Sequence, residues 1–377
     1  MIERVVRALI RLLSIAAQTV RGVRDPPPRD SVRRIVALQM SGVGDLLLTT
    51  PALRALHRLY PAARIDVITY KLGSASFLFR LPYMGRGCEF PLFELELKRA
   101  WSPSFWRGLA RPIRFLREEP CDLYVSFHHT WLLQWYLFEL WVAARARARF
   151  AIGINPDFLA GPGVFDRAVP ESLLGERHYR PFFLDVVSLL GEAGHDVTME
   201  FPLEPDEVRQ ASERLRQAMP GCRIVCLHMG ASHAAQLWPV ERYVEFAQRC
   251  CRDGYGLVLI GTEGERGLAD QVAKSLPAGR VLNVTGATTL SEMAAFIAAS
   301  DLFVGNDSGP MHVAIALQRP TIGLIGPGRP RYYRYGLHEA VILRNPILFD
   351  IHDRKDSPYP WVITVDEVYR HARILLA

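Results

Sequence analysis

The chain has 377 residues, of which 49% are hydrophobic and 22% charged, as in soluble globular proteins with room for two cored domains. Its formal net charge is +6, but residues 1–34 alone hold eight arginines against three carboxylates. The remainder is close to neutral, which argues against a broad basic surface for nucleic acid. The six cysteines lack the paired C-x-x-C spacing of zinc sites, so we expect reduced cysteines in the core of a cytosolic protein.

Residues 1–30 are predicted to form a basic amphipathic helix followed by a proline-rich linker. Apolar side chains fall on one side of this helix, and Arg4, Arg7 and Arg11 cluster on the opposite side. Arg11 interrupts the apolar run and no small-residue cleavage site is evident, so neither a signal peptide nor a spanning helix fits well. Two interpretations remain open: the helix lies on the inner membrane surface and makes the cytoplasmic protein peripheral, or it packs on the protein's own surface or on a partner.

Residues 31–200 are predicted to form an N-terminal domain in which strands alternate with helices. The predicted strands cover 34–39, 64–70, 122–127 and 150–153, and the predicted helices cover 46–59, 106–117 and 131–146. This alternation indicates a parallel sheet with helices on both faces. The last helix is rich in tryptophan, but it is too short to span a membrane and carries Glu139, so we expect a helix buried in the core.

Residues 201–377 are predicted to form a second Rossmann-like, doubly wound α/β domain. Its predicted strands cover 223–228, 256–261, 280–284, 301–305 and 320–325, and its predicted helices cover 206–218, 240–252, 263–275, 290–299 and 310–317. Two such domains in one chain are expected to face each other across a cleft. Open α/β sheets bind ligands at the carboxyl ends of their strands, so we expect the ligand-binding and catalytic residues at these strand ends.

A glycine-rich turn within Gln39–Leu56 joins the first predicted strand to the first predicted helix. The dinucleotide-binding fingerprint needs a third glycine where Leu47 stands, and a phosphate-binding P-loop needs a lysine that this stretch lacks. What remains is a tight turn that places one carboxylate, Asp45, at the N-terminus of a helix.

The strongest signal is Gly305–His312, which follows an apolar strand and precedes an apolar helix. Asp307 or Ser308 is suited to capping this helix, and Gly309 allows close approach of the backbone to a ligand. Free amides and the helix dipole would then bind an anion, with His312 as a further donor. The alternative is a capped helix in which His312 only packs.

Three more strand ends of the second domain carry features that suit a ligand. His228–Ser232 has small residues that leave backbone amides accessible. In Gly261–Glu265 the carboxylates could accept hydrogen bonds from ribose hydroxyls, although Glu265 is equally suited to pairing with a helix dipole. The arginines of Gly326–Arg331 are suited to phosphate. Together these strand ends predict a site for a nucleotide diphosphate.

The sequence resembles glycosyltransferase family 9, the bacterial lipopolysaccharide heptosyltransferases, which transfer heptose from ADP-heptose to the growing core. The resemblance runs from about Arg34 to Leu376, and the run from Asp307 to His312 is its most specific part. The matching residues are Gly44-Asp45 with Thr50-Pro51, Gly230-Ala-Ser232 with Trp238-Pro239, Asp307-Ser-Gly-Pro-Met-His312 with Ala314, Pro320-Thr321 with Gly326-Pro327, and Ile363-Thr-Val-Asp-Glu-Val368.

This resemblance implies the GT-B fold, with the lipid-linked glycan acceptor on the N-terminal domain and the nucleotide-sugar donor on the C-terminal one. It also implies inversion at the anomeric carbon without a metal or other cofactor, and the sequence has no D-x-D motif for Mg²⁺. Asp45 would be the base that takes the proton of the acceptor hydroxyl, with helix-end amides keeping its pKa low; the alternative is that Asp45 only caps the helix.

The donor and acceptor residues follow from the same resemblance and from the strand ends. The donor-binding candidates are Gly230, Ala231, Ser232, Gln236, Glu265, Asp307, Ser308, Gly309, Met311 and His312. The acceptor-binding candidates are Gly44 and, from their charge and their place after the second strand, Lys71, Arg80 and Arg86.

One residue departs from the family's pattern, because Gln236 stands where members usually carry a lysine that meets the diphosphate. A neutral amide does not neutralise phosphate charge. Three explanations are open: Arg329 or Arg331 compensates, the donor differs, or the activity is weak. Two other functions are therefore kept beside glycosyl transfer, namely a nucleotide-sugar epimerase of the same architecture and a catalytically silent nucleotide-binding protein in envelope assembly.

Overall fold

The structure is a computed structural model that describes residues 24–90, 103–128, 133–157, 159, 163–175, 177–326, 333, 335–336, 338–345 and 361–377. The chain divides into two compact units, Met1–Thr198 and Met199–Ala377. The sequence-based division between residues 200 and 201 is two residues further along. The predicted N-terminal helix, Arg329 and Arg331 lie outside the described residues.

The N-terminal unit is built on a six-stranded parallel sheet with the order β3-β2-β1-β4-β5-β6. Its strands are β1 (Arg34–Leu38), β2 (Arg64–Thr69), β3 (Met84–Glu89), β4 (Leu123–Ser126), β5 (Phe150–Asn155) and β6 (Arg167–Pro170). Its helices are η1 (Arg29–Ser31), α2 (Val43–Leu59), η2 (Leu72–Arg80), α3 (Pro103–Arg117), α4 (Leu133–Ala146), η4 (Glu171–Leu173) and α5 (Tyr179–Ser188).

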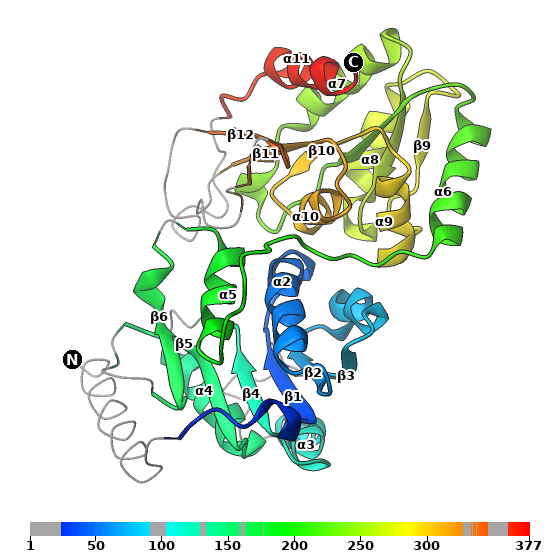
Figure 1. The fold of residues 1–377 in the computed structure, drawn as a ribbon. Coiled ribbons are helices and arrows are strands. Elements are labelled where there is room, and N and C mark those ends of the chain that lie inside the picture. Colours follow the sequence, from blue (N-terminus) through cyan, green and yellow to red (C-terminus); the bar gives the residue numbers. More distant parts are fainter. Residues whose placement is uncertain are drawn as a thin grey trace. The chain divides into compact units, whose positions relative to one another are not determined.

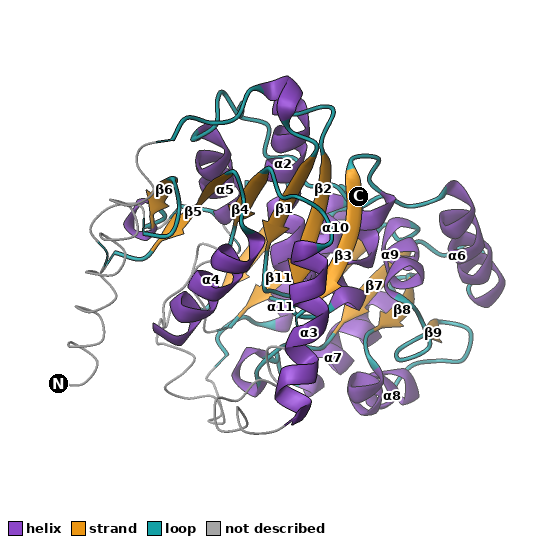
Figure 2. Ribbon diagram, turned by 90° about the horizontal axis from the view of Figure 1, so that it is seen from below, coloured by secondary structure: helices purple, strands orange, loops and turns teal. Residues whose placement is uncertain are grey.

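Helices cover both faces of this sheet. Helix α2 lies beside α5 (Figure 1), and α3 lies beside α4 (Figure 2). Every residue of β1 is buried, which explains why its sequence is a nearly continuous apolar run rather than an alternating one. Val142, Ala143 and Ala146 of α4 are buried in the core formed by β1, β4, α3 and α4, so the predicted tryptophan-rich helix is a core helix over its described side chains.

The C-terminal unit contains a second six-stranded parallel sheet, with the order β12-β11-β10-β7-β8-β9. Its strands are β7 (Ile224–His228), β8 (Gly256–Ile260), β9 (Val281–Asn283), β10 (Leu302–Asn306), β11 (Thr321–Ile325) and β12 (Val341–Arg344). Its helices are α6 (Pro205–Ala218), η5 (Ala234–Gln236), α7 (Val240–Arg252), η6 (Glu263–Glu265), α8 (Arg266–Lys274), α9 (Leu290–Ala298), α10 (Gly309–Ala316) and α11 (Val365–Leu375).

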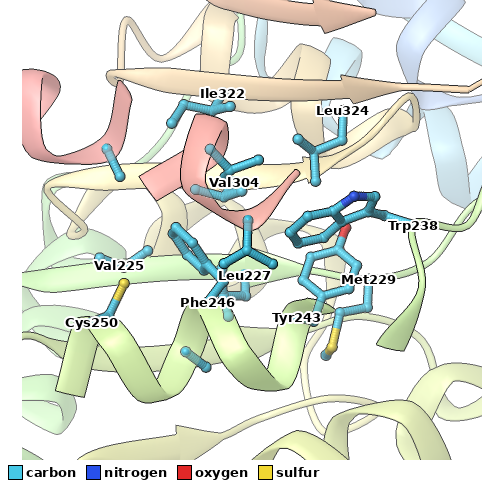
Figure 3. Packing of buried hydrophobic residues seen from close by; sticks show 14 of the residues in the cluster. Val225, Leu227, Met229, Trp238, Tyr243, Phe246, Cys250, Val304, Ile322 and Leu324 are labelled. Atoms are coloured by element: carbon cyan, nitrogen blue, oxygen red, sulfur yellow. The ribbon is translucent and has the colours of Figure 1, made fainter. Parts of the chain in front are cut away.

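The core of this unit lies between α7 and the central strands. Phe246 and Tyr243 of α7 face Val225 and Leu227 of β7 (Figure 3). The ring of Trp238 meets that of Tyr243 edge-on, with 4.9 Å between the centroids. Because Trp238 stands at the start of the segment leading into α7, this contact fixes the loop that follows β7.

The predicted fold class is confirmed: each unit is a Rossmann-like α/β layer structure, as in the GT-B class. The elements that the sequence patterns did not predict are η1, η2, β3, β6, η4, α5, η5, β12 and α11. Three of these are strands at the edges of the two sheets, where one side has no neighbouring strand and the sequence need not be apolar. Within the described part of the chain, no helix has both the length and the apolar character needed to cross a membrane.

Candidate functional site

Asp45 lies in the first turn of α2, which begins after the extended N-cap residue Gly42. Burial raises the pKa of Asp45 to about 6, although hydrogen bonds from the backbone at Gly42 and Asp45 and from Ser41 oppose this shift. The prediction that helix-end amides keep the pKa low is therefore wrong, because the loss of water outweighs the amides. A half-buried carboxylate with this pKa accepts a proton more readily than an ordinary surface aspartate.

Buried polar side chains hold the helical turn that carries Asp45. The Thr49 hydroxyl donates to the carbonyl oxygen of Asp45 at 2.8 Å and accepts from Gln39 Nε2 at 3.0 Å. Pro51 lies inside α2 and has no N–H for the carbonyl of Leu47, and the Thr50 hydroxyl donates to that carbonyl at 2.7 Å. Sequence patterns did not indicate a role for Gln39 and Thr49, whose only signal is a polar residue inside each of two apolar runs.

Tyr70 is a second residue near Asp45 that the sequence analysis did not single out. It directly follows β2, and its hydroxyl oxygen is 3.7 Å from the position that a Cβ on Gly42 would take. Burial raises the pKa of Tyr70, and the charge of Asp45 adds to that shift. Tyr70 and Asp45 thus share the carboxyl edge of the sheet, where β1 and β2 both end.

The four acceptor candidates fall in different places. Gly44 is next to Asp45 in the first turn of α2, and the exposed Lys71 directly follows Tyr70. Arg80 is exposed and ends η2. Arg86 lies in the amino-terminal half of β3, because Ile65 pairs with Met84 and Val67 with Gly87.

The surroundings of Arg86 explain why the structure does not bring it to Asp45. Its guanidinium donates to Glu118 and Glu119 at 3.0 Å each, and its backbone amide donates to Asp66 at 2.8 Å. From the sequence, Arg86 was expected in a loop after the second strand. It is instead part of an edge strand, tied to carboxylates at the amino edge of the sheet.

Another carboxylate, Glu139 of α4, is buried beside the end of β4. It accepts a hydrogen bond from the Tyr124 hydroxyl at 2.6 Å and one from the Ser126 hydroxyl at 2.9 Å. Burial raises the pKa of Glu139 to about 7, although both hydrogen bonds oppose the shift. Both carboxylate oxygens therefore already have protein partners, and Glu139 pins α4 to the end of β4.

In the C-terminal unit, the turn after β10 leads into α10 with an unusual cap. Ser308 is the N-cap residue, but its side chain makes no capping hydrogen bond. The hydroxyl instead lies 3.0 Å from His228 Nδ1 and donates to the Asn306 carbonyl at 3.1 Å. The predicted side-chain cap by Ser308 is thus wrong. Pro310 has no N–H, and the Met311 amide donates to the Ser308 carbonyl at 3.1 Å, so in the described first turn of α10 it is the Gly309 amide that can bind an anion.

Met311 and His312 have their side chains turned into the protein. Met311 is fully buried, and its sulfur is 2.7 Å from the position that a Cβ on Gly323 would take. His312 Nδ1 lies 2.5 Å from the Tyr335 hydroxyl, and its Nε2 is 3.9 Å from Asp307 Oδ1. Both ring nitrogens of His312 therefore face protein groups in this structure.

Glu265 ends η6, the short helical turn after β8. Its Oε2 accepts from the backbone amide of Thr262 at 2.6 Å and lies 3.5 Å from His228 Nε2. Burial acts to raise its pKa, but the hydrogen bond and charge of His228 and the bonds from Thr262 outweigh burial and hold the pKa of Glu265 below its usual range. Glu265 is therefore an ionised acceptor that also completes the capping box of η6.

Glycines make room for this carboxylate. A Cβ on Gly230 would lie 1.7 Å from Glu265 Oε1, and one on Gly261 would lie 2.4 Å from Oε2. We expected Gly230 to admit a ligand, whereas its missing side chain admits Glu265. Ala231 is half-buried and Ser232 is exposed, so the segment after Gly230 comes to the surface.

Asn306, another residue that the sequence analysis missed, fixes this segment from the end of β10. Its Nδ2 donates to the carbonyl of Met229 at 2.8 Å, and its Oδ1 accepts from the backbone amide of Trp238 at 3.2 Å. Gln236, which lies between Met229 and Trp238 in the chain, is the last residue of η5. Among the described residues, the buried Oε1 of Gln236 has no hydrogen-bond partner. The backbone of Gly326 adjoins it, since a Cβ on Gly326 would lie 3.1 Å from Gln236 Cα.

The described part of the chain contains no group of three or more His, Cys, Asp or Glu side chains that could hold a metal ion. The candidate chemistry thus consists of a carboxylate with a raised pKa in the N-terminal unit and a carboxylate, two imidazoles and an uncapped helix in the C-terminal unit.

Comparisons with known proteins agree with the resemblance. Residues 179–357 match the family model of glycosyltransferase family 9 (heptosyltransferase). Lipopolysaccharide heptosyltransferase 3 of Escherichia coli is 26% identical over 75% of this chain and 80% of its own length. Among solved structures, a family 9 glycosyl transferase from Veillonella parvula has a TM-score of 0.73 at 20% identity, covering 91% of this chain and 97% of its own. ADP-heptose lps heptosyltransferase II of E. coli has a TM-score of 0.71 at 21% identity, covering 91% and 98%. The two structures show that the fold is shared.

Proposed function

We propose that this chain is a glycosyltransferase of the heptosyltransferase-like family 9 type, and that it moves a heptose from ADP-heptose onto a lipopolysaccharide core or a related envelope glycan. The sugar and the nucleotide are those named for the E. coli heptosyltransferase II that shares this fold. The observation that carries the proposal is the Asp45 carboxylate at the end of β1, whose pKa burial raises to about 6.

The proposed reaction is a single displacement with inversion. Asp45 takes the proton from an acceptor hydroxyl while that oxygen forms a bond to the anomeric carbon of the donor sugar. The bond between the anomeric carbon and the diphosphate oxygen breaks at the same time, and ADP leaves with the electron pair. A base with a pKa near 6 is ionised at neutral pH and still strong enough to assist as the hydroxyl loses its proton.

The C-terminal unit supplies the proposed donor site. The N-terminus of α10, where Ser308 makes no side-chain capping bond, offers the Gly309 amide and the positive end of the helix dipole to the diphosphate. Glu265, which is ionised, accepts from a ribose hydroxyl. Because main-chain donors stabilise the leaving group, no metal ion is needed in this scheme, and the absence of a D-x-D motif in the sequence supports it.

The neutral Gln236 weakens the diphosphate site relative to a lysine at the same place. We therefore propose a donor held mainly by amide dipoles, and hence less sensitive to salt than one held by a lysine. A lipid-linked acceptor would also place the protein at the inner membrane surface, and the basic residues of positions 1–30 support that location. Flotation with anionic vesicles, comparing the full chain with one that begins at residue 24, tests it.

The test of the function is an incubation of the purified protein with ADP-heptose and a truncated core acceptor, with and without EDTA. Product glycan with inverted anomeric configuration by NMR, formed equally in both arms, supports the proposal. An altered free sugar would show an epimerase instead. Tight ADP binding without turnover would show a silent binding protein.

A further inference from the structure

The side chain of Gln39 links the two ends of the turn that carries Asp45. Gln39 directly follows β1, and its residue is only 3% exposed. The hydroxyl of Ser41, which precedes α2, donates to Gln39 Oε1 at 3.1 Å. Gln39 Nε2 donates to the hydroxyl oxygen of Thr49, inside α2, at 3.0 Å. The amide of Gln39 thus lies between one residue before Asp45 and one residue after it.

The orientation of this amide follows from the hydrogen of the Thr49 hydroxyl. That hydroxyl has one hydrogen, and it donates the hydrogen to the carbonyl oxygen of Asp45 at 2.8 Å. Thr49 can therefore only accept from Gln39, so the amide nitrogen faces Thr49 and the amide oxygen faces Ser41. Because Gln39 is buried, its oxygen depends on a protein donor, and Ser41 supplies one.

The Asp45 carboxylate is a second acceptor for the same serine. Besides the backbone at Gly42 and Asp45, the Ser41 side chain hydrogen-bonds to this carboxylate and lowers its pKa. A serine hydroxyl has one hydrogen and two lone pairs. The hydrogen of Ser41 can therefore be given to the Gln39 oxygen or to the Asp45 carboxylate, but not fully to both.

The protonation state of Asp45 decides between the two acceptors. A protonated Asp45 can donate to the Ser41 oxygen while Ser41 keeps its hydrogen bond to Gln39, so all three side chains are paired. An ionised Asp45 can only accept. It then draws the Ser41 hydrogen to itself and leaves the buried oxygen of Gln39 without its donor, which is unfavourable. Ionisation of Asp45 is therefore opposed by Gln39 as well as by burial.

One other titratable group lies near this network. The hydroxyl of Tyr70, which follows β2, is close to the start of α2. Burial and the charge of Asp45 raise the pKa of Tyr70, so Tyr70 is neutral over the pH range in which Asp45 titrates. Within the described ranges, no charged side chain contributes to the pKa shift of Asp45. The hydrogen bonds of Ser41 are thus free of a competing ion pair at this carboxylate.

We propose that Gln39 is a positioning residue for the reaction: it competes with Asp45 for the single hydroxyl hydrogen of Ser41, and thereby keeps Asp45 a stronger base. Because this role presupposes that Asp45 takes the proton of the acceptor hydroxyl, it rests on the proposed function. Gln39 acts through Ser41 and is given no contact with either substrate.

Three variants of the full chain test the competition, namely Gln39→Met, Ser41→Ala and the combination of both. Methionine has nearly the length of glutamine and lacks the amide oxygen. We would measure the pKa of Asp45 directly by NMR titration of protein labelled with ¹³C at the aspartate carboxyl carbons. The resonance of Asp45 is identified by its loss in Asp45→Asn. Thermal unfolding shows whether each variant is folded.

The two single variants are expected to shift the pKa of Asp45 in opposite directions. Ser41→Ala removes a donor to the carboxylate and should raise the pKa by about one unit. Gln39→Met releases the Ser41 hydrogen to Asp45 and should lower the pKa by about half a unit. In the Ser41→Ala background, Gln39→Met should change nothing, because the shared hydrogen is already gone.

The combined variant separates this competition from a loosened turn. If Gln39→Met merely admitted water to Asp45, the pKa would fall in both backgrounds. A fall that persists in the Ser41→Ala background, or no fall in Gln39→Met alone, would overturn the role of Gln39. Should Gln39→Met not fold, protein labelled with ¹³C at the glutamine amide carbons decides. A glutamine resonance that titrates with the midpoint of Asp45 in the wild type, and no longer does so in Ser41→Ala, supports the competition, and its absence overturns it.

The acid midpoint of kcat/KM distinguishes this inference from the function on which it rests. With ADP-heptose and acceptor, the kinetic midpoint should move in the same direction as the NMR pKa in each variant. If the NMR shifts occur and the kinetic midpoint does not follow them, Asp45 is not the base, and the role of Gln39 in the reaction is wrong with it. If the kinetic midpoint matches the pKa of Asp45 but the opposite shifts are missing, the inference about Gln39 alone is overturned.

Discussion

Asp45 and Glu265 are both carboxylates in the short segment after a buried parallel strand, yet their surroundings shift their pKa values in opposite directions. Burial desolvates Asp45, no cationic group among the described residues offsets this, and its pKa rises to about 6. Glu265 faces His228 and an amide donor, and its pKa falls below the usual range. The difference suits two tasks: the first can exchange a proton near neutral pH, and the second stays ionised to accept hydrogen bonds. Both carboxylates therefore follow the end of a strand, and the groups around each one determine its pKa and the chemistry it suits.

The largest expected effect comes from removing the first carboxylate. Asp45→Asn keeps the shape and removes the base, so we expect turnover to fall by about 10³-fold while the Kd for ADP is unchanged. Single-turnover assays with ADP-heptose and acceptor, beside calorimetry with ADP, measure the two quantities. Thr49→Val is the matched control, because it alters the same helical turn and leaves the carboxylate in place. Normal turnover in Asp45→Asn would exclude Asp45 as the base.

The pH dependence of the rate sharpens the comparison. A base must be deprotonated to act, so kcat/KM should fall on the acid side with a midpoint near pH 6, the raised pKa of Asp45. Glu139 has a pKa of about 7 and could produce a similar limb. In Glu139→Gln the midpoint should stay where it was. A midpoint of kcat/KM near pH 4, or a midpoint that shifts in Glu139→Gln, would contradict the assignment of Asp45 as the base.

A smaller effect is expected where the second carboxylate is displaced without being removed. Gly230→Ala places a Cβ 1.7 Å from the present position of Glu265 Oε1, so the flexible carboxylate must move. We expect about tenfold weaker ADP binding, with kcat changed less than twofold at saturating donor. Gly267→Ala in α8 is the control, because nothing lies within 4 Å of its added Cβ. Equal ADP affinities in the two variants would mean that Glu265 does not contact the nucleotide.

The architecture was predictable because central parallel strands are buried on both faces and read as apolar runs, as in β1 and β7. Edge strand β3, Met-Gly-Arg-Gly-Cys-Glu, has no such run, and its omission led to the misplacement of Arg86. Strand ends also indicated Asp45, Glu265 and Ser308. The sequence alone did not predict their pKa shifts, because the desolvation of Asp45 depends on how the chain packs around it. The contacts of His228 with Glu265 and Ser308 join three segments far apart in the chain.

The smallest expected effect is on stability and carries a definite sign. The pKa of Asp45 is higher in the folded protein than in the unfolded chain, so between about pH 4 and 6 the folded state binds more protons. The contribution of Asp45 to stability is thus present at low pH and is lost as the pH rises through 6. Asp45→Asn should unfold at the same denaturant concentration as the wild type near pH 4. At pH 8 it should be more stable than the wild type by about 1 kcal/mol, a value reduced from the full linkage energy because the carboxylate is half-buried.

Glu265→Gln should show the opposite sign, losing stability at pH 8 because the fold stabilises the ionised Glu265 carboxylate. Denaturant titrations of both variants at the two pH values measure this, and equal signs would show that the two carboxylates do not differ as their surroundings require.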